Sequence, residues 1–172
     1  MNAFIWAQIA GILGIAGGMA LFHAKDMRGA RKWKLTIDII WSAHYILLGA
    51  YTGFATSIIA AGREIVFLNN DKKICQHKAW PWFFIFLNFV GAVITWKGLY
   101  SIFPALSSMV STFIFWQKDI KRARYMGLGV NTMMFTYDVF AGSHMGMLTE
   151  TISFVSTVVA IYRYREHKKE KN

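Results

Sequence analysis

The sequence predicts an all-α integral membrane protein with seven transmembrane helices, arranged as two parallel three-helix repeats joined by a linker helix. Three observations predict this fold class. The 172 residues are 55% hydrophobic and only 16% charged, which is too apolar for the surface of a soluble domain of this size. The basic residues cluster between long apolar runs, as they do in membrane proteins. A stretch of the first half also recurs in the second half.

Seven apolar segments approach the roughly 20 helical residues that cross a bilayer. They are residues 3–22, 35–52, 53–70, 80–96, 98–116, 126–142 and 145–164. The first has no Lys or Arg before it and a basic cluster after it, which predicts an uncleaved helix with its N-terminus outside. The second and third segments, the fourth and fifth, and the sixth and seventh adjoin at glycines that suit tight turns. These glycines are Gly53, Gly98, Gly142 and Gly146.

Lysine and arginine concentrate on one predicted face of the membrane. Segments 25–34, 72–78, 118–124 and 163–171 carry 5, 3, 4 and 5 of them, and seven helices place all four segments on one side. The opposite side has only Lys97, and Arg63 lies within a helix, so 17 of the 19 basic residues share a side. The positive-inside rule makes this side cytoplasmic. We therefore expect an external N-terminus and a cytoplasmic C-terminus.

The basic loop occurs twice, 93 positions apart. Residues 22–31 read FHAKDMRGAR and residues 115–124 read FWQKDIKRAR; without a gap, residues 13–66 and 106–159 share 12 identities in 54 positions. The single membrane domain, 1–172, therefore divides into a first repeat (1–70), a linker helix (80–96), a second repeat (98–164) and a basic tail (165–172). Three helices plus one is an even number, so both repeats insert with the same polarity. Parallel repeats of this kind are a transporter architecture, with a site between the halves.

This 3+1+3 plan resembles the SWEET sugar transporters, the PnuC vitamin transporters and the wider PQ-loop (MtN3-like) group. The whole chain resembles the small YgjV-type bacterial inner-membrane proteins, on the stretches KDMRGAR, WSAHYILLGAYTG and GREIVF. That resemblance implies a multi-pass protein of the bacterial inner membrane, with a periplasmic N-terminus. The chain lacks the proline–glutamine pair of the PQ-loop group, and Gly11 stands where the repeat would match Pro104.

Other classes of protein fit the sequence less well. The net charge of +10 lies in loops between apolar runs, so we expect the lipid bilayer, with anionic lipid at the basic loops, and no nucleic acid as partner. The single cysteine, Cys75, allows no intramolecular disulfide and has no metal-ligand spacing around it, so no metal or cofactor is expected. No nucleophile elbow or phosphate loop occurs, and His44 with Glu64 would lack a nucleophile, so we expect no enzyme.

Polar residues at membrane depth are candidates for a binding site, because each charge there costs roughly 2.5–3.5 kcal/mol. Counting about 1.5 Å per residue places His44 and Arg63 near the midplane. The repeat pairs His44 with Tyr137, Arg63 with Ser156, and Glu64 with Thr157. The sequence thus predicts a polar ring at one height, suited to a small polar solute.

Helical spacing adds two stripes to this ring. Asp38, Trp41 and Tyr45 follow an i, i+3, i+7 pattern and share a helix face. Their repeat partners are Asn131, Met134 and Asp138. We expect the two stripes to face each other across a cavity and to stack on a sugar, nucleoside or vitamin-like solute.

Simpler interpretations of the same residues remain open. Arg63 could pair with Glu64 and fix helix packing, Asp38 could be a structural anchor, and His44 an interior histidine. Glu150 is expected at the outer interface. Two functions follow: a transporter of a small polar solute, or a membrane-embedded binding or assembly protein that uses its basic loops. Substrate, coupling ion and oligomeric state are left open, and an oligomer is compatible with the plan.

Overall fold

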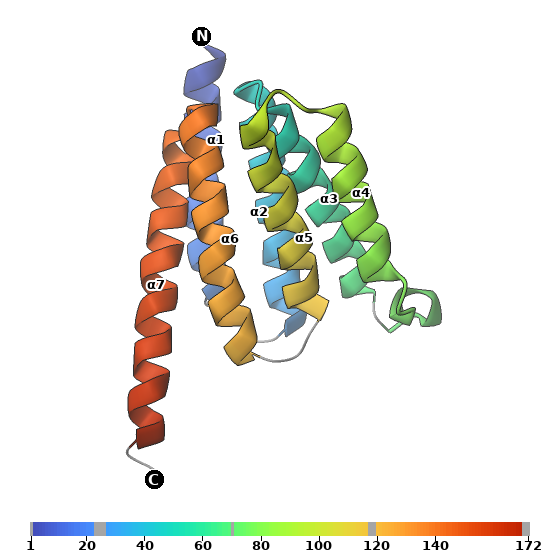
Figure 1. The fold of residues 1–172 in the computed structure, drawn as a ribbon, viewed down its shortest axis with the longest axis vertical. Helices are drawn as coiled ribbons and strands as arrows, with labels where there is room; N and C mark the ends of the chain where they lie inside the picture. The colour runs from blue at the N-terminus through green and yellow to red at the C-terminus, as the bar shows by residue number, and fades with distance from the viewer. Residues whose placement is uncertain (1, 23–26, 70, 117–119, 170–172) are drawn as a thin grey trace.

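Seven α-helices form the computed structural model, which describes residues 2–22, 27–69, 71–116 and 120–169 (Figure 1). The helices are α1 (Ala3–Phe22), α2 (Met27–Leu47), α3 (Tyr51–Leu68), α4 (Trp80–Ile94), α5 (Ile102–Trp116), α6 (Ile120–Ala141) and α7 (His144–Lys169). Two short 3-10 helices, η1 (Lys73–Gln76) and η2 (Leu99–Ser101), lie in the connections before α4 and α5. No strand occurs in these described ranges.

Each helix overlaps one predicted segment, but α2 begins well before the predicted start at residue 35. The added turns contain Ala30, Arg31, Lys32 and Lys34, which are good helix formers. Lys34, expected in the loop, therefore lies inside α2. At the other end, α2 stops at Leu47 rather than at residue 52, because the chain turns at Gly49, whose φ of +67° favours glycine.

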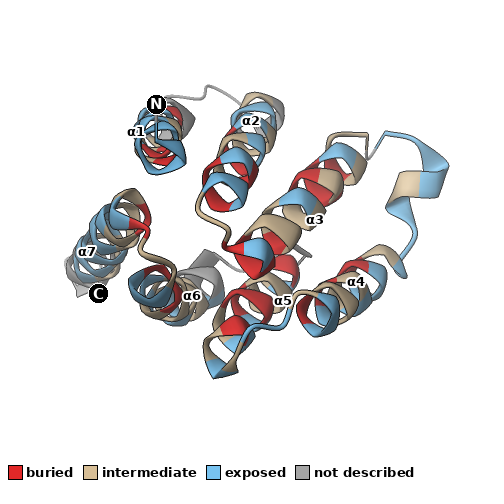
Figure 2. Cartoon of the chain, turned by 90° about the horizontal axis from the view of Figure 1, so that it is seen from above, coloured by how far each residue is buried: buried red, intermediate tan, exposed pale blue. Residues whose placement is uncertain are grey.

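Six helices close into a ring, as Figure 2 shows from above. Along the chain α1 packs on α2, α2 on α3, α5 on α6, and α6 on α7. The ring is completed by α3 against α5 and by α7 against α1. Helix α4 lies outside this ring and packs on α3 and α5.

The packing places polar groups inside and apolar side chains outside. Among the described residues, the largest fully buried side chains include Arg63, Tyr137, His44, Glu64 and Asn88. Large apolar side chains point outward along α1, α4, α6 and α7, for example Ile12, Phe89, Phe140 and Val155. A surface this apolar is unusual for a soluble monomer and fits contact with lipid.

By length and composition, one helical stretch of the described chain is long and apolar enough to cross a membrane: His144–Tyr162. Three shorter apolar helical stretches are Ala3–Gly18, Trp80–Ile94 and Leu99–Ile114. The seven helices thus match the seven segments in number, whereas seven membrane spans stay a prediction. The charged residues inside α2 and α3 lower the hydropathy of those helices.

The turns between α2 and α3 and between α6 and α7 have the same geometry. Gly49 and Gly142 both have φ +67°. In each turn the next residue donates its backbone N–H at 2.9 Å to a carbonyl five positions back, from Ala50 to Tyr45 and from Ser143 to Asp138. The predicted repeat alignment pairs all of these positions, 93 residues apart.

The two ends of the bundle differ. The N-terminus and both tight turns lie at one end, here called the turn end, and the C-terminus and the α3–α4 loop at the other (Figure 1). That loop carries Lys72, Lys73 and Lys78, so the second end is called the basic end. The centres of the two repeated loops, residues 23–26 and 117–119, lie outside the described residues.

Candidate functional site

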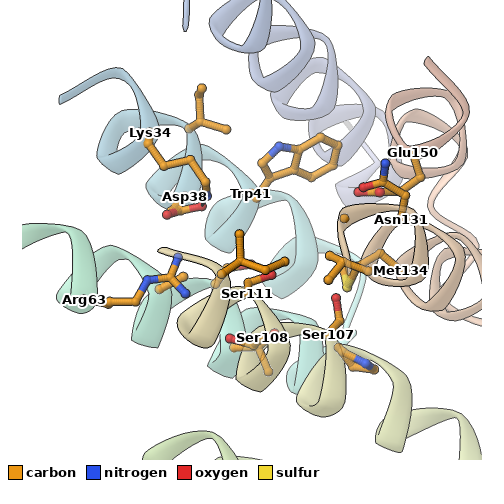
Figure 3. Close-up of a pocket in the computed structure, with 18 of the residues that line it drawn as sticks. Lys34, Asp38, Trp41, Arg63, Ser107, Ser108, Ser111, Asn131, Met134 and Glu150 are labelled. Carbon is orange, nitrogen blue, oxygen red and sulfur yellow. Dashed lines mark hydrogen bonds and ion pairs between the residues drawn. The ribbon is translucent and has the colours of Figure 1, made fainter. Parts of the chain in front are cut away.

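A polar pocket of about 350 Å³ lies inside the ring, between α2, α3, α5, α6 and α7. Its size is at the small end of the range for small-molecule sites. Tyr45 lines the pocket, as do the residues labelled in Figure 3, which are Lys34, Asp38, Trp41, Arg63, Ser107, Ser108, Ser111, Asn131, Met134 and Glu150. The lining combines charged groups, hydroxyls and one indole with apolar side chains such as Ile37, Ile114 and Val130, which suits a small ligand with both polar and apolar parts.

Several positions that the predicted repeat alignment pairs line this pocket together. Five pairs separated by 93 residues are Lys34 and Gly127, Ile37 and Val130, Asp38 and Asn131, Trp41 and Met134, and Ser57 and Glu150. The pocket therefore straddles the boundary between residues 1–70 and residues 98–164.

The structure brings the two predicted stripes together. Five of their six members line the pocket, and the sixth, Asp138, lies just beyond it toward the turn end. There Tyr45 Oη donates a hydrogen bond of 2.9 Å to Asp138 Oδ1, and both side chains are buried. The stripes meet because their helices, α2 and α6, lie on opposite sides of the ring.

One side of the pocket contains two ion pairs. The Lys34 ammonium bonds Asp38 Oδ1 one turn along α2, while the buried Asp38 Oδ2 has no hydrogen-bond partner. Arg63 Nη2 donates to Glu64 Oε1 at 3.1 Å, and Arg63 Nη1 donates to Thr112 Oγ1 on α5 at 3.1 Å. The Arg63–Glu64 pair anticipated as a packing device thus exists, although Arg63 also lines the pocket.

Glu150 lies on the other side of the pocket. The interfacial position predicted for it is wrong, because Glu150 lines the pocket together with Asn131 and Trp41 (Figure 3). With the Asn131 amide oriented so that both of its atoms find partners, its nitrogen donates to Glu150 Oε2 at 3.2 Å and its oxygen accepts from the Phe154 N–H at 3.2 Å. Trp41 lies between this group and Asp38 in Figure 3.

The predicted polar ring at one height is not found. His44 is three residues from the end of α2 and lies near the turn end. Its Nδ1 donates to the Ala7 carbonyl at 2.6 Å. Its Nε2 then accepts from Ser143 Oγ at 2.7 Å. The height was misjudged because α2 was expected to begin at residue 35.

The other ring members also separate. Tyr137 Oη, near His44, accepts the N–H of Gly53 at 2.9 Å. Ser156 is exposed on α7, and the half-buried Thr157 bonds only its own helix, at the Ser153 carbonyl. Among the described residues that line the pocket with Arg63, neither Ser156 nor Thr157 occurs.

A second cavity, of about 180 Å³, lies at the turn end. Four of its ten lining residues are aromatic, and another is Lys97, whose Nζ donates to the Gly49 carbonyl at 2.8 Å. Tyr137 lines this cavity and Tyr45 lines the pocket, and their ring centroids are 5.8 Å apart. The two tyrosines form part of the layer that separates the cavities.

Sequence reasoning missed the serines of α5 and the role of Glu150. Ser107, Ser108 and Ser111 follow an i, i+1, i+4 pattern on an otherwise apolar helix, and this periodicity could have found them. The repeat alignment pairs Glu150 with Ser57, which lies one turn beyond Gly53 in α3 and also lines the pocket. This pairing could have indicated that Glu150 lies in the pocket. In the described part of the chain, no group of three His, Cys, Asp or Glu residues could hold a metal ion.

Comparison with known proteins gives one match. The family model Imp-YgjV, described as a bacterial inner membrane protein, matches residues 5–168. The match runs from the first turn of α1 to the last turn of α7. No curated protein and no solved structure matches the chain.

Proposed function

Because the chain belongs to the Imp-YgjV family of bacterial inner membrane proteins, we propose that it carries a small polar solute across that membrane, without chemical conversion. The observation that carries this proposal is the polar pocket, which equivalent positions of both halves line in pairs. A site between two structural repeats is what alternating access requires, because rocking one half against the other exposes it to each side in turn.

The helix contacts support two equivalent halves. In the proposed repeat, α1 corresponds to α5, α2 to α6, and α3 to α7. The contact of α3 with α5 is then equivalent to the contact of α7 with α1. Both contacts are present, and the two tight turns share their φ values and hydrogen bonds. The proposed relation to the SWEET, PnuC and PQ-loop architecture rests on this plan of three helices, one linker and three helices.

Hydrogen bonds between the halves support a closed gate at the turn end. Tyr45 bonds Asp138, Tyr137 bonds the Gly53 N–H, and His44 bonds Ser143. The pocket extends away from this layer to Ile114 and Gly127, near the basic ends of α5 and α6. We therefore interpret the conformation as open toward the basic end.

The charge distribution supports an orientation for this gate. The basic end carries the loop with Lys72, Lys73 and Lys78 and the C-terminus, so we place it in the cytoplasm, beside anionic lipid headgroups. The gated turn end and the N-terminus then face the periplasm. In this orientation the described conformation is the inward-facing one.

Water access to the pocket tests the proposal. Cys75 is first replaced by serine, and Ser108→Cys then places a thiol in the pocket. A membrane-impermeant thiol reagent is applied from each face separately. Transport predicts labelling from the cytoplasmic face, together with slower labelling from the periplasmic face as the gate opens.

Two controls make the labelling interpretable. Ser156→Cys, on the exposed side of α7, is expected to stay unlabelled because lipid covers it. The unmodified chain reports reagent access at the basic end through Cys75 in η1. If Cys75 reacts while Ser108→Cys reacts from neither face, the pocket is dry. The transporter proposal then fails, and the alternative of a binding or assembly protein with basic loops takes its place.

A further inference from the structure

The interior of the ring is acidic, although the whole chain has a net charge of +10. Four of the nine acidic residues of the chain lie inside the ring: Asp38, Glu64, Asp138 and Glu150. Of the 19 basic residues, the described interior contains Lys34 and Arg63. Carboxylates thus outnumber cations inside a protein whose loops are strongly basic.

Both interior cations already have carboxylate partners. Lys34 bonds Asp38, and Arg63 bonds Glu64 as well as the Thr112 hydroxyl. Glu150 receives the neutral amide of Asn131, and no described cationic side chain lies within ion-pair distance of it. A carboxylate without an ion pair is costly inside a membrane protein and is neutralised there by a proton or by a cation, so a cationic ligand can take the place of the proton and gain affinity.

A second carboxylate, that of Asp38, also lines the pocket. Asp38 is only 6% exposed, and its Oδ2 atom, turned away from the Lys34 contact, has no hydrogen-bond partner. The serines of α5 lie opposite, and Ser108 Oγ is likewise buried without a partner. Between Asp38 and Glu150 lies Trp41 (Figure 3), and an indole face attracts cations.

We infer that the pocket takes a small solute with an amine or quaternary ammonium group, with this cationic group at Glu150 beside Trp41 and a hydrogen-bond donor of the same solute at the Asp38 carboxylate. This assignment rests on the proposed function, because it names the solute class that the transporter would carry. A neutral sugar would leave Glu150 uncompensated, and an anionic solute would add repulsion. The volume of about 350 Å³ limits the solute to a small molecule.

Choline and 3,3-dimethyl-1-butanol test the charge requirement, because they share shape and hydroxyl and differ only in the positive charge. Each is added to the Cys75→Ser, Ser108→Cys protein in membrane vesicles while the rate of thiol labelling is measured. Ethanolamine and ethylene glycol form a smaller pair for the same comparison. We expect the cation of at least one pair to slow labelling several-fold at a concentration where its neutral partner has no effect.

Glu150→Gln is expected to abolish this difference, because it removes the charge and keeps the shape. Asp71→Asn, which removes an acid from the exposed α3–α4 loop, should leave it intact. Glu150→Asp keeps the charge and is expected to retain part of the protection. The charged and neutral compounds are compared in protein that retains Glu150. The charge requirement can therefore be tested even if Glu150→Gln does not fold.

The outcomes separate this inference from the proposed function. If Ser108→Cys is labelled but neither cation protects better than its neutral partner, the amine assignment is overturned while the transporter proposal stands. Protection that persists in Glu150→Gln would overturn the role of Glu150. A labelling rate that depends on Glu150 and on pH, without protection by either cation, would mean a proton site and would also overturn the assignment. No labelling at all would reject the transporter itself.

Discussion

Tyr45 Oη donates a 2.9 Å hydrogen bond to Asp138 Oδ1, and the predicted repeat alignment pairs these two residues, 93 positions apart. If the proposed repeat relates the two halves by an axis, equivalent residues can contact each other only near that axis. The bond therefore lies near that axis, between the pocket and the turn end. Any motion that separates the halves at the turn end must break it.

Tyr45→Phe should weaken the turn-end layer. A buried hydrogen bond to a charged group contributes about 1.5–3 kcal/mol, so its loss should raise the labelling rate of Ser108→Cys from the periplasmic face roughly tenfold or more. Tyr162→Phe, at an exposed position of α7, is the matched control and should change nothing. An unchanged periplasmic rate in Tyr45→Phe would mean that this bond does not hold the gate.

Gly53→Ala should destabilise the contact between the halves. A Cβ there would lie 2.8 Å from both Tyr45 Cγ and Tyr137 Cε1, and such overpacking costs about 1–3 kcal/mol. Gly146→Ala, at the equivalent position, would clash with Asp138 and Ser143. The loss of stability in Gly53→Ala and in Gly146→Ala is measured as the change in the free energy of unfolding in detergent micelles.

The control for the Gly53→Ala and Gly146→Ala variants is Gly129→Ala, at an exposed position of α6 where an added Cβ would meet no heavy atom within 4 Å. Alanine favours a helix by up to about 1 kcal/mol over glycine. Gly129→Ala should therefore be neutral or stabilising. Equal losses at all three glycines would show that backbone flexibility, and not the tight packing of Gly53 and Gly146, decides stability.

Gly49→Ala and Gly142→Ala should each lower the free energy of unfolding by about 1–2 kcal/mol, because both glycines have φ +67°. A Cβ added at either position would meet no heavy atom within 4 Å, so backbone strain alone should decide the loss. The two losses should be similar, since the two turns share their geometry. Gly18→Ala, helical and unobstructed, is the control, and a loss there as large as at Gly49 would contradict the role of φ.

A double-mutant cycle on Arg63 and Glu64 should show strong coupling. Arg63→Met leaves a buried carboxylate without its partner, and Glu64→Gln leaves a buried guanidinium, each costing about 3–5 kcal/mol. The double variant should cost clearly less than the sum of the two single changes. Unfolding in detergent measures all four proteins, and strict additivity would mean that the pair contributes no coupling.

Much of the helix plan was predictable from the sequence, because apolar runs and glycines mark the helices and turns. The stripes of α2 and α6 were predictable as well, since an i, i+3, i+7 spacing fixes a helix face without knowledge of the fold. The start of α2 was not, because Arg31, Lys32 and Lys34 suit both a helix and a loop. That error of about two turns misplaced the height of His44.

The positions of Ser156 and Glu150 depend on how each helix is rotated within the ring, and a single sequence does not fix this rotation. Mapping Arg63 onto Ser156 assumed that both halves bury equivalent residues. Helix α4 covers α3, however, and the described part of the second half has no helix corresponding to α4. The two halves therefore share their turns and central contacts but differ in which outer positions are covered.

The Arg63–Glu64 ion pair joins neighbours in the chain, so it needs no other helix to form. An isolated charge at the centre of a helix opposes membrane insertion by about 2.5–3.5 kcal/mol. If α3 spans the membrane, as the sequence predicts, both charges lie on one segment, and α3 can leave the insertion machinery as a net-neutral helix before the second half has been synthesised. Thr112 can then join Arg63 once α5 has inserted, so biogenesis of the first half does not have to wait for the second.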